Sequence, residues 1–456
     1  MYNVQVAVLG LIACCAAQAA AASPLIVHEW GTFTSFQDAD GETIAGINVD
    51  DEPVPAFVHR LGNLPLFQST SLPATWSQGA PSCHPAVTLR LETPVLYFYP
   101  PADWAPTAFD VRATFNGGWL TEFYPSAIAD AGRFPNELTA DTRGSLHWQS
   151  LRLNPGASTL MPQTTAGVWL APREVKAEVV AQASSREAEK YVFYRGVGHL
   201  DAPVVVRERD GGWDLALRDR AALSNLPRVW LVEVFSDGRV RHQTAAVRGR
   251  SLHLPGFSTG SAGAKSSLPA LQRELADALG AQGLFADEAA AMLATWKLSY
   301  FESPGLRVFF LLPQSWTDAQ LPLSISAPAE VTRVMVGRIE LVTARQRETL
   351  AKLQALPLDA YPRLPLYYDD NRVLRASNQA GRSLSQLYEF SGREVPESLR
   401  LYESLGRFRD ALVVHAWRST ADDSRRATLR RAIAAYSACV PVDPAELKPA
   451  QLTSGK

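Results

Sequence analysis

Apolar and polar residues alternate through the first half of the chain, most clearly over residues 87–92 and again over 109–115. A period of two is typical of a strand that buries one face. The Asn-Gly-Gly tripeptide at 116–118 supplies the positive φ that a tight turn needs. We therefore expect a β-hairpin whose return strand begins at Trp119.

The same alternation predicts further short strands with turn residues between them. They cover residues 24–34, 146–153, 190–195, 204–209, 213–218, 229–235 and 239–247. Asp237 and Gly238 form a second hairpin signal between the last two of these strands. Short strands that recur with turns favour antiparallel, sandwich-like packing over a parallel sheet.

Beyond residue 267 the spacing of apolar residues lengthens to three or four, which indicates helices. Ser267 is a cap for the first of them. We predict helices over 268–279, after Asp287, and over 343–356, 399–417 and 424–437, with strands at 306–312 and 331–342. The predicted fold class is α+β: antiparallel β-sandwich-like domains followed by a mixed α+β region.

A chain of 456 residues exceeds one ordinary core, so we expect several domains. Segments rich in Pro, Gly and Ser at 154–167 and 255–267 are the candidate boundaries. We therefore place a β-rich domain at 23–154, a second at 168–255 and an α+β domain at 268–456.

Composition and charge restrict the partners. The chain is 46% hydrophobic and 20% charged, with a formal net charge of -2. Dispersed Lys and Arg lack the basic footprint of nucleic-acid binding. Past the N-terminal segment no apolar run is long enough to span a bilayer, so we expect no transmembrane span in the mature chain.

The N-terminus indicates export. An apolar, alanine-rich run over 4–22 ends before Ser23, which predicts a signal peptide at 1–22 even though no basic residue precedes it. Leu-Ile-Ala-Cys at 11–14 also fits a lipoprotein signal acylated at Cys14, and an uncleaved anchor is a third alternative. All three place the protein outside the cytoplasm: periplasmic, secreted, or lipid-anchored at the outer membrane.

Cleavage before Ser23 leaves Cys83 and Cys439. An even count in an oxidising compartment predicts one disulfide between them. The alternative is two separate thiols, with Cys83 and His84 as a metal or redox pair.

Four sequence strings resemble a family of uncharacterised exported bacterial proteins. They are the His-Glu-Trp-Gly-Thr-Phe-Thr motif at 28–34 and the strings at 92–99, 193–198 and 336–340. The resemblance covers nearly the whole mature chain and implies that it is one intact unit. It implies no activity, cofactor or catalytic residue.

Candidate metal ligands occur in the first hundred residues, but no spacing joins them. Imidazoles and carboxylates suit Zn or Cu, and alternating carboxylates in a Gly-containing turn suit Ca. The candidates are His28, His59, His84, Asp38, Asp40, Asp50 and Asp51. The alternative is a hydrogen-bonded His28 in a sheet and ordinary solvated turns elsewhere.

Two catalytic arrangements are open. Ser258 lies in a Gly-x-Ser-x-Gly string, and Asp369 or Asp370 and then His415 follow in an order that permits a triad. The Gly- and Ser-rich context lacks the strand and helix of a nucleophile elbow. Glu92 and Glu122, expected on neighbouring strands, are a second pair; a glycosidase would hold its carboxyl groups about 5–10 Å apart.

Arginines 425, 426, 430 and 431 lie opposite the apolar stripe of the last predicted helix, where they either contact lipid headgroups or form a solvated face beside acids. Taken together, the sequence favours an exported, β-rich binding protein of unknown ligand. The alternative is an extracytoplasmic hydrolase of an envelope or environmental polymer, metal-assisted or carboxylate-based.

Overall fold

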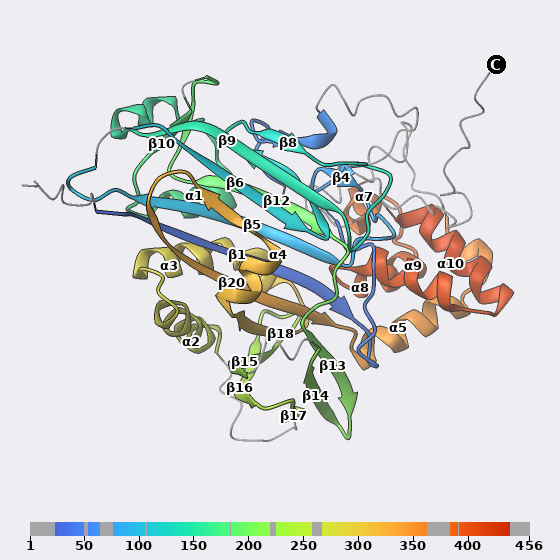
Figure 1. The fold of residues 1–456 in the computed structure, drawn as a ribbon. Coiled ribbons are helices and arrows are strands. Elements are labelled where there is room, and N and C mark those ends of the chain that lie inside the picture. Colours follow the sequence, from blue (N-terminus) through green and yellow to red (C-terminus); the bar gives the residue numbers. More distant parts are fainter. Residues whose placement is uncertain are drawn as a thin grey trace, which may run out of the picture.

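The computed structural model describes residues 23–49, 53–63, 76–104, 107–182, 184–218, 225–257, 267–362, 384–390 and 392–437. These residues form a mixed α+β protein with one large sheet and a group of C-terminal helices (Figure 1). The predicted α+β class is confirmed.

The large sheet runs through eleven strands on its main path. In spatial order they are β11 (Glu187–Glu189), β10 (Val180–Gln182), β9 (Arg143–Leu153), β7 (Gly118–Tyr124), β12 (Val192–Gly198), β5 (Leu89–Tyr99), β1 (Leu25–Gln37), β20 (Ala329–Leu341), β18 (Gly305–Leu312), β15 (Asn225–Val234) and β16 (Val240–Arg248). Shorter or branching strands pair beside this path: β2 (His59–Arg60), β6 (Phe109–Asn116), β8 (Ile128–Asp130) and β19 (Leu323–Ile325). Two small sheets contain β13 (Val204–Arg209), β14 (Gly212–Leu217) and β17 (Ser251–Pro255), and β3 (Trp76–Ser77) with β4 (Ala80–Pro81).

Strands from all three predicted domains pair within this one sheet. The longest pairing is parallel and joins β1 to β20 along the whole length of both strands. β5 pairs with the other edge of β1 in the antiparallel sense. The three predicted domains are therefore not built on three separate sheets. Strand partners are selected by long-range packing as well as by nearness in sequence.

The two predicted hairpins have different outcomes. Gly238 has a φ of 82° and joins β15 to β16, which pair directly, so this hairpin is confirmed. Gly117 has a φ of 83° as expected, and β7 begins next to it. However, β6 pairs with β9 and β19 rather than with β7, so the hairpin predicted at 116–118 is wrong. The turn at Gly117 instead leads into β7, which lies on the main path of the large sheet.

Most helices after residue 267 lie where the sequence predicts them, whereas those at 167–173, 314–320 and 384–390 were not predicted. The helices are α1 (Gly167–Arg173), α2 (Leu268–Ala281), α3 (Ala286–Thr295), α4 (Gln314–Gln320), α5 (Ala344–Ala355), α7 (Leu384–Phe390), α8 (Glu397–Ser404), α9 (Arg409–Ser419) and α10 (Asp423–Tyr436). A π-helical turn, η4 (Lys297–Glu302), follows α3, and 3-10 turns occur at Leu61–Asn63 (η1), Pro155–Leu160 (η3) and Leu358–Ala360 (η5). Ser267 caps α2 as predicted, by accepting a hydrogen bond from the N–H of Ala270.

One predicted helix is two. The stretch predicted as a single helix over 399–417 is divided into α8 and α9, with Gly406 between them at a φ of 89°. A residue in the left-handed backbone conformation ends a helix, and glycine adopts this conformation without strain. Among the described helices, none combines the length and the hydropathy needed to cross a bilayer.

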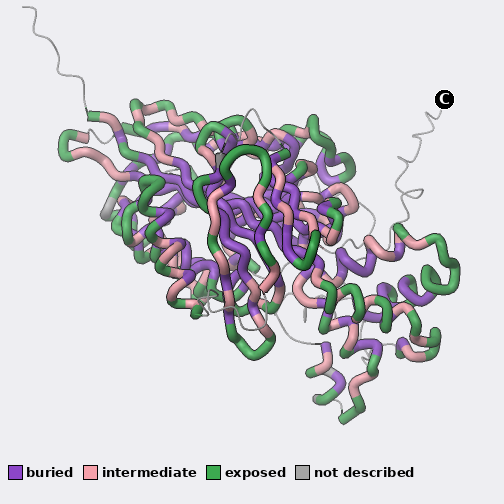
Figure 2. The backbone as a smooth tube through the Cα atoms, turned by 90° about the horizontal axis from the view of Figure 1, so that it is seen from below, coloured by how far each residue is buried: buried purple, intermediate pink, exposed green. Residues whose placement is uncertain are grey.

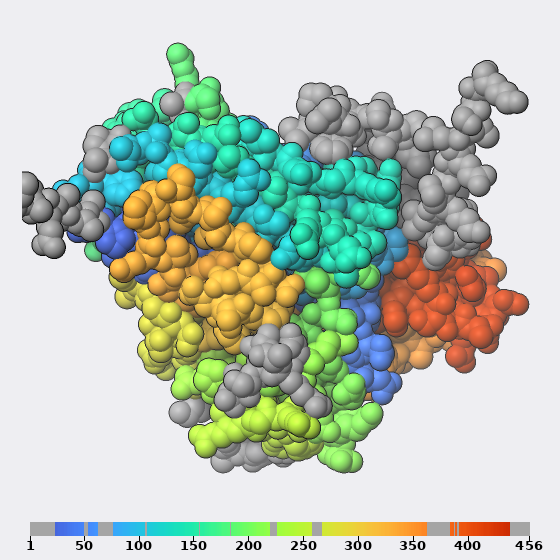
Figure 3. Space-filling view, viewed as in Figure 1, coloured from blue at the N-terminus to red at the C-terminus, as the bar shows by residue number. Residues whose placement is uncertain are grey.

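Each face of the large sheet carries its own hydrophobic core. One core lies between the sheet and helices α1, α2 and α3 and contains Trp30, Trp169 and Trp296. The other contains residues of β6 and β9, the small sheet of β13, β14 and β17, and the C-terminal helices. Figure 2 shows the central strands buried and the exposed residues at the periphery. In Figure 3 the C-terminal helices, in red, form a lobe at one end of the molecule.

The glycine at 196 tests how closely the central strands approach one another. A Cβ at Gly196 would lie 2.1 Å from the carbonyl oxygen of Trp119 on β7. We expect Gly196→Ala to lower the free energy of unfolding by about 1–3 kcal/mol, because backbone must move to admit the methyl group. Urea denaturation of the purified protein measures this loss.

The control is Gly280→Ala, since nothing lies within 4 Å of a Cβ at that position of α2. Alanine there should leave stability unchanged or raise it by up to about 1 kcal/mol, through helix propensity. Equal effects of the two substitutions would contradict the close approach of β7 and β12.

Candidate functional site

The four strings of the family resemblance lie on four adjacent strands. Spatially these strands run in the order β12, β5, β1, β20, in the centre of the large sheet. The histidine-containing motif is on β1, and the strings at 92–99, 193–198 and 336–340 are on β5, β12 and β20. The four strings, far apart in the sequence, thus meet in one place.

The backbone is irregular at this place. The pairing of β5 shifts register against β1 between Trp30 and Thr32, and against β12 between Phe193 and Gly196. Thr93, within the shifted segment of β5, has a φ of 46°. A β-branched residue in the left-handed region is an outlier, and such strain concentrates at functional sites. Bulges likewise occur beside active and binding sites.

Glu92 is a buried carboxylate with donors on several elements. Its oxygens accept hydrogen bonds from the hydroxyl groups of Thr34 on β1, at 2.8 Å, and of Tyr300 on η4. The guanidinium of Arg90 lies 2.8 Å from it, and that of Arg407, between α8 and α9, lies 3.3 Å from it. Glu92 therefore joins the sheet, η4 and the C-terminal helices.

A second buried ion-pair group continues from this carboxylate. Arg338 on β20 lies 3.8 Å from Glu92 and also pairs with Glu340, to which Arg307 is 3.0 Å away. Burial lowers the pKa of Arg307 to about 10, so it stays protonated at neutral pH. Burial and the charge of Glu92 raise the pKa of Tyr300, which keeps its proton for the hydrogen bond.

Glu122 is held by a separate pair of arginines. Its carboxylate pairs with Arg195 on β12 and, at 2.8 Å, with Arg60 on β2. β12 lies between β5 and β7, so the prediction that Glu92 and Glu122 occupy neighbouring strands is wrong. Two strand spacings separate their backbones by about 10 Å, and Arg195 stands between them.

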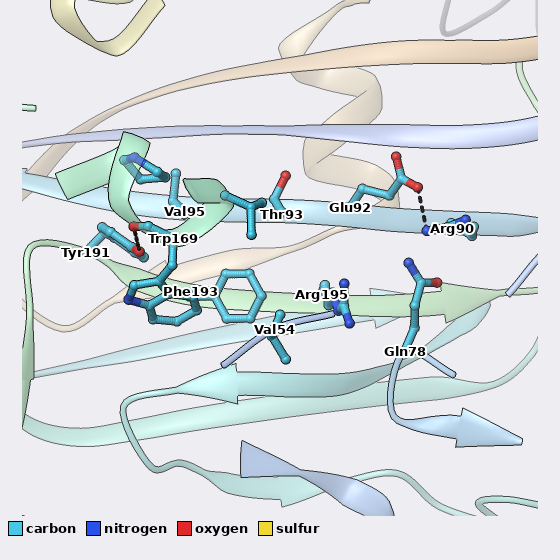
Figure 4. A pocket seen from close by; sticks show the side chains of 12 residues that line it. Val54, Gln78, Arg90, Glu92, Thr93, Val95, Trp169, Tyr191, Phe193 and Arg195 are labelled. Atoms are coloured by element: carbon cyan, nitrogen blue, oxygen red, sulfur yellow. Dashed lines mark hydrogen bonds and ion pairs between the residues drawn. The ribbon is translucent and has the colours of Figure 1, made fainter. Parts of the chain in front are cut away.

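A pocket opens beside these carboxylates (Figure 4). Its empty space is about 450 Å³, part of which is open to solvent. The pocket is lined by Val54, Gln78, Arg90, Glu92, Thr93, Val95, Val168, Trp169, Pro172, Tyr191, Phe193 and Arg195.

The pocket has an apolar end and a polar end. Figure 4 shows Trp169, Tyr191 and Phe193 at one end, and Arg90 and Arg195 at the other. The apolar end is fixed by the hydrogen bond from the Tyr191 hydroxyl to the Trp169 carbonyl, at 2.9 Å. At the polar end each arginine already pairs with a carboxylate.

Gln78 is the unusual side chain of the polar end. It is 1% exposed, and neither its amide nitrogen nor its amide oxygen has a hydrogen-bond partner among the described residues. Its φ of 54° is a second left-handed conformation beside that of Thr93. An unpaired buried amide costs about 1–3 kcal/mol, so a native structure keeps one only where something else compensates.

The histidines among the metal candidates are engaged separately. His28 Nδ1 lies 2.8 Å from buried Glu288, which also accepts from the Tyr99 hydroxyl. His59 pairs with Glu187 at 2.8 Å. His84 Nδ1 accepts from the Ala86 N–H at 3.2 Å. Across the described part of the chain, no three His, Cys, Asp or Glu side chains form a metal-binding group.

The carboxylates of the predicted calcium turn serve the turn itself. Asp38 Oδ1 accepts from the N–H groups of Asp40 and Glu42, both at 2.9 Å, as in an ordinary Asx turn. Asp40 lies 3.7 Å from Arg209 on the exposed surface. The other two metal candidates, Asp50 and Asp51, lie outside the described residues.

Several other candidates also lie outside the described residues: Cys14 and the signal segment, Ser258, Asp369, Asp370 and Cys439. Cys83 is buried and disulfide-bonded rather than a titrating thiol. The pairing of Cys83 with Cys439 stays a prediction. Burial lowers the pKa of His415 on α9, as for a histidine packed in a helical stripe.

The sequence reading missed the arginines of the site. Arg195, Arg307 and Arg338 each interrupt an otherwise apolar strand segment. Arginine is almost never fully buried unless it is paired. A single cation within an apolar strand was therefore a usable signal for a buried ion pair, although it does not name the partner.

Comparisons with known proteins add no function. No protein-family model and no curated protein matches this chain. The chain is similar to the Fcho1 mu-homology domain from Danio rerio with a bound Eps15 peptide, at 12% identity and a TM-score of 0.25, over 70% of this chain and 96% of that one. It is also similar to the yeast delta-COP-I mu-homology domain complexed with a Dsl1 WxWxV peptide, at 10% identity and a TM-score of 0.20, over 71% and 97%. Likeness at these TM-scores carries no argument.

Removing the charge of Glu92 should destabilise the protein strongly. In Glu92→Gln, the arginines that share this carboxylate lose their buried counter-charge. We expect the free energy of unfolding to fall by about 3–5 kcal/mol, the usual cost of breaking a buried pair. Urea denaturation followed by tryptophan fluorescence measures the change.

The matched control is Glu137→Gln, because Glu137 pairs with Arg133 at 2.7 Å on the surface. An exposed pair of this spacing contributes only about 0.3–0.5 kcal/mol. A loss from Glu92→Gln as small as that of the control would contradict the role of Glu92 as a buried hub.

His84 should make the protein sensitive to acid. Burial lowers its pKa from 6.5 to about 4, so between these pH values the unfolded state binds a proton that the folded state does not. Stability is then fully present above about pH 6.5 and is lost as the pH falls toward 4, by at most about 3 kcal/mol. In His84→Gln, the difference in unfolding free energy between about pH 7 and about pH 4.5 should shrink accordingly. The same pH dependence in both proteins would refute this assignment.

Proposed function

We propose that this chain is an extracytoplasmic binding protein whose ligand enters the pocket between β5, β12 and α1. The observation that carries the proposal is the buried amide of Gln78, which has no partner among the described residues. A donor and an acceptor directed at a pocket, with strained backbone at Gln78 and at Thr93, fit a polar group held ready for a ligand.

The charges around the pocket favour a neutral ligand group. The two arginines that line the pocket already have carboxylate partners, because Arg90 pairs with Glu92 and Arg195 with Glu122. The Gln78 amide offers one donor group and one acceptor at the polar end. A ligand with a small neutral polar group, such as a carboxamide, attached to an apolar group would match both ends of the pocket. If the ligand is a polymer or an envelope component, one terminal or side group of it would enter.

Export is part of the proposal. The apolar run over 4–22 and the disulfide-bonded state of Cys83 both support a compartment outside the cytoplasm. Disulfides persist in oxidising compartments and are rare in the cytosol. Under this proposal the exported protein is secreted, periplasmic, or attached to a membrane by a lipid anchor at Cys14.

The geometry lends less support to a carboxylate-based hydrolase. A general acid or base needs a carboxyl group within hydrogen-bond reach of the substrate. Glu122 is 1% exposed and pairs with Arg60 and Arg195, while the oxygens of Glu92 accept from two hydroxyl groups and face three arginines. The contacts of both carboxylates therefore support a role in stabilising the fold more than a role in catalysis.

Three probes of one shape test the ligand class: isobutyramide, isobutyrate and isobutylamine. We expect the amide alone to raise the midpoint of thermal unfolding, because only it matches the donor and acceptor of Gln78. Binding of the anion in preference to the amide, or of none of the three, would overturn the neutral-head proposal.

Substitution of Gln78 gives a second readout. Gln78→Leu should abolish the amide effect and, at the same time, raise the free energy of unfolding by about 1 kcal/mol or more, since the unpaired amide is removed. The control is Gln243→Leu, whose side chain bonds the Pro255 carbonyl at 2.6 Å, away from the pocket. Loss of stability in Gln78→Leu with unchanged amide binding would contradict the proposal.

A further inference from the structure

Helix α10 packs through one face and leaves the other to solvent. Leu429, Ile433 and Tyr436 are buried against neighbouring C-terminal helices. Ala427 and Ala434 lie on the exposed side. Four exposed arginines belong to the same helix, and we call them the arginine face: Arg425, Arg426, Arg430 and Arg431.

The arginine face is poorly compensated within the chain. Arg425 lies 3.8 Å from Asp422, and Arg426 lies over the ring of Trp417 at 5.2 Å. Arg430 and Arg431 form no ion pair with any residue that the structure describes. Of the neighbouring acids, Asp422 caps α10 and Asp423 lies in its first turn. The later turns therefore carry surplus positive charge.

We propose that the arginine face docks on the anionic headgroups of a phospholipid bilayer. Guanidinium groups bind phosphate oxygens through two parallel hydrogen bonds. Arg430 and Arg431 lie on the exposed side beside small Ala427 and Ala434, which allow that side to approach a flat surface closely, while Arg425 and Arg426 extend from the exposed start of the helix. The inference is independent of the pocket and of its ligand.

The energy of such docking is electrostatic and additive over the arginines. Each basic residue near an anionic bilayer contributes about 1 kcal/mol, which is about fivefold in partitioning. Salt screens the attraction beyond about 10 Å at 0.1 M. Docking should therefore weaken steeply with ionic strength, and it should not occur on a zwitterionic bilayer.

Co-sedimentation of the full mature chain, without a lipid anchor, tests the proposal. The probes are vesicles of phosphatidylcholine alone and with about 30 mol% phosphatidylglycerol, at low and at raised salt. We expect binding to the anionic vesicles only. Changing all four arginines to glutamine should abolish it, and Arg430→Gln with Arg431→Gln, which keeps the first turn intact, should weaken it about 25-fold.

The control removes the same charge elsewhere: Arg133, Arg239, Arg248 and Arg250, all exposed, changed to glutamine. Circular dichroism and the midpoint of thermal unfolding must match the parent protein in every variant used. Binding that the control weakens as much as the arginine-face variants, or no binding to anionic vesicles, would overturn the proposal. Saturable binding of free glycerophosphoglycerol would also overturn it, because a discrete phosphate site would then replace a surface.

Discussion

The rest of the structure depends on a carboxylate taken out of water. Glu92 is buried in the middle of the sheet, and a buried charge is tolerated only when it is paired and hydrogen-bonded. Its partners come from β1, from η4 and from the segment between α8 and α9, through Thr34, Tyr300 and Arg407. The same interaction thus orders the sheet, covers one of its faces and attaches the C-terminal helices. Loss of a partner would take a hydrogen bond or a counter-charge from the buried carboxylate, which makes this arrangement specific as well as stable.

The motif on β1 shows how one strand connects two layers. His28 reaches Glu288 on α3, whereas its neighbour Glu29 pairs with Arg333 and accepts from Tyr194. Successive side chains of a strand point to opposite faces, so adjacent polar residues hold different layers. His28 and Glu29 therefore connect the sheet to different neighbouring elements. The imidazole of His28 and the carboxylate of Glu29 are engaged within the protein.

The pocket differs from this network in one respect. Arg90 and Arg195 there are compensated by carboxylates, but the buried amide of Gln78 is not compensated by any described residue. Left-handed backbone at Gln78 and Thr93 adds strain in the same place. Proteins accept such local costs where binding requires them, and the surrounding ion pairs supply the rigidity that keeps the strained groups in position. The arrangement suits selective binding better than proton transfer.

By itself the sequence determined much of the local structure: strands of the first half, the cap at Ser267 and the turn at Gly238. These depend on side-chain period, capping and φ, which neighbouring residues set. Only the tertiary structure decided which strands pair and which charges meet. β12 separates Glu92 from Glu122, and Gly406 divides a helix whose apolar spacing is continuous. Strand order and buried ion pairs join residues hundreds of positions apart, and their energies arise only once both partners leave water, so no local pattern encodes them.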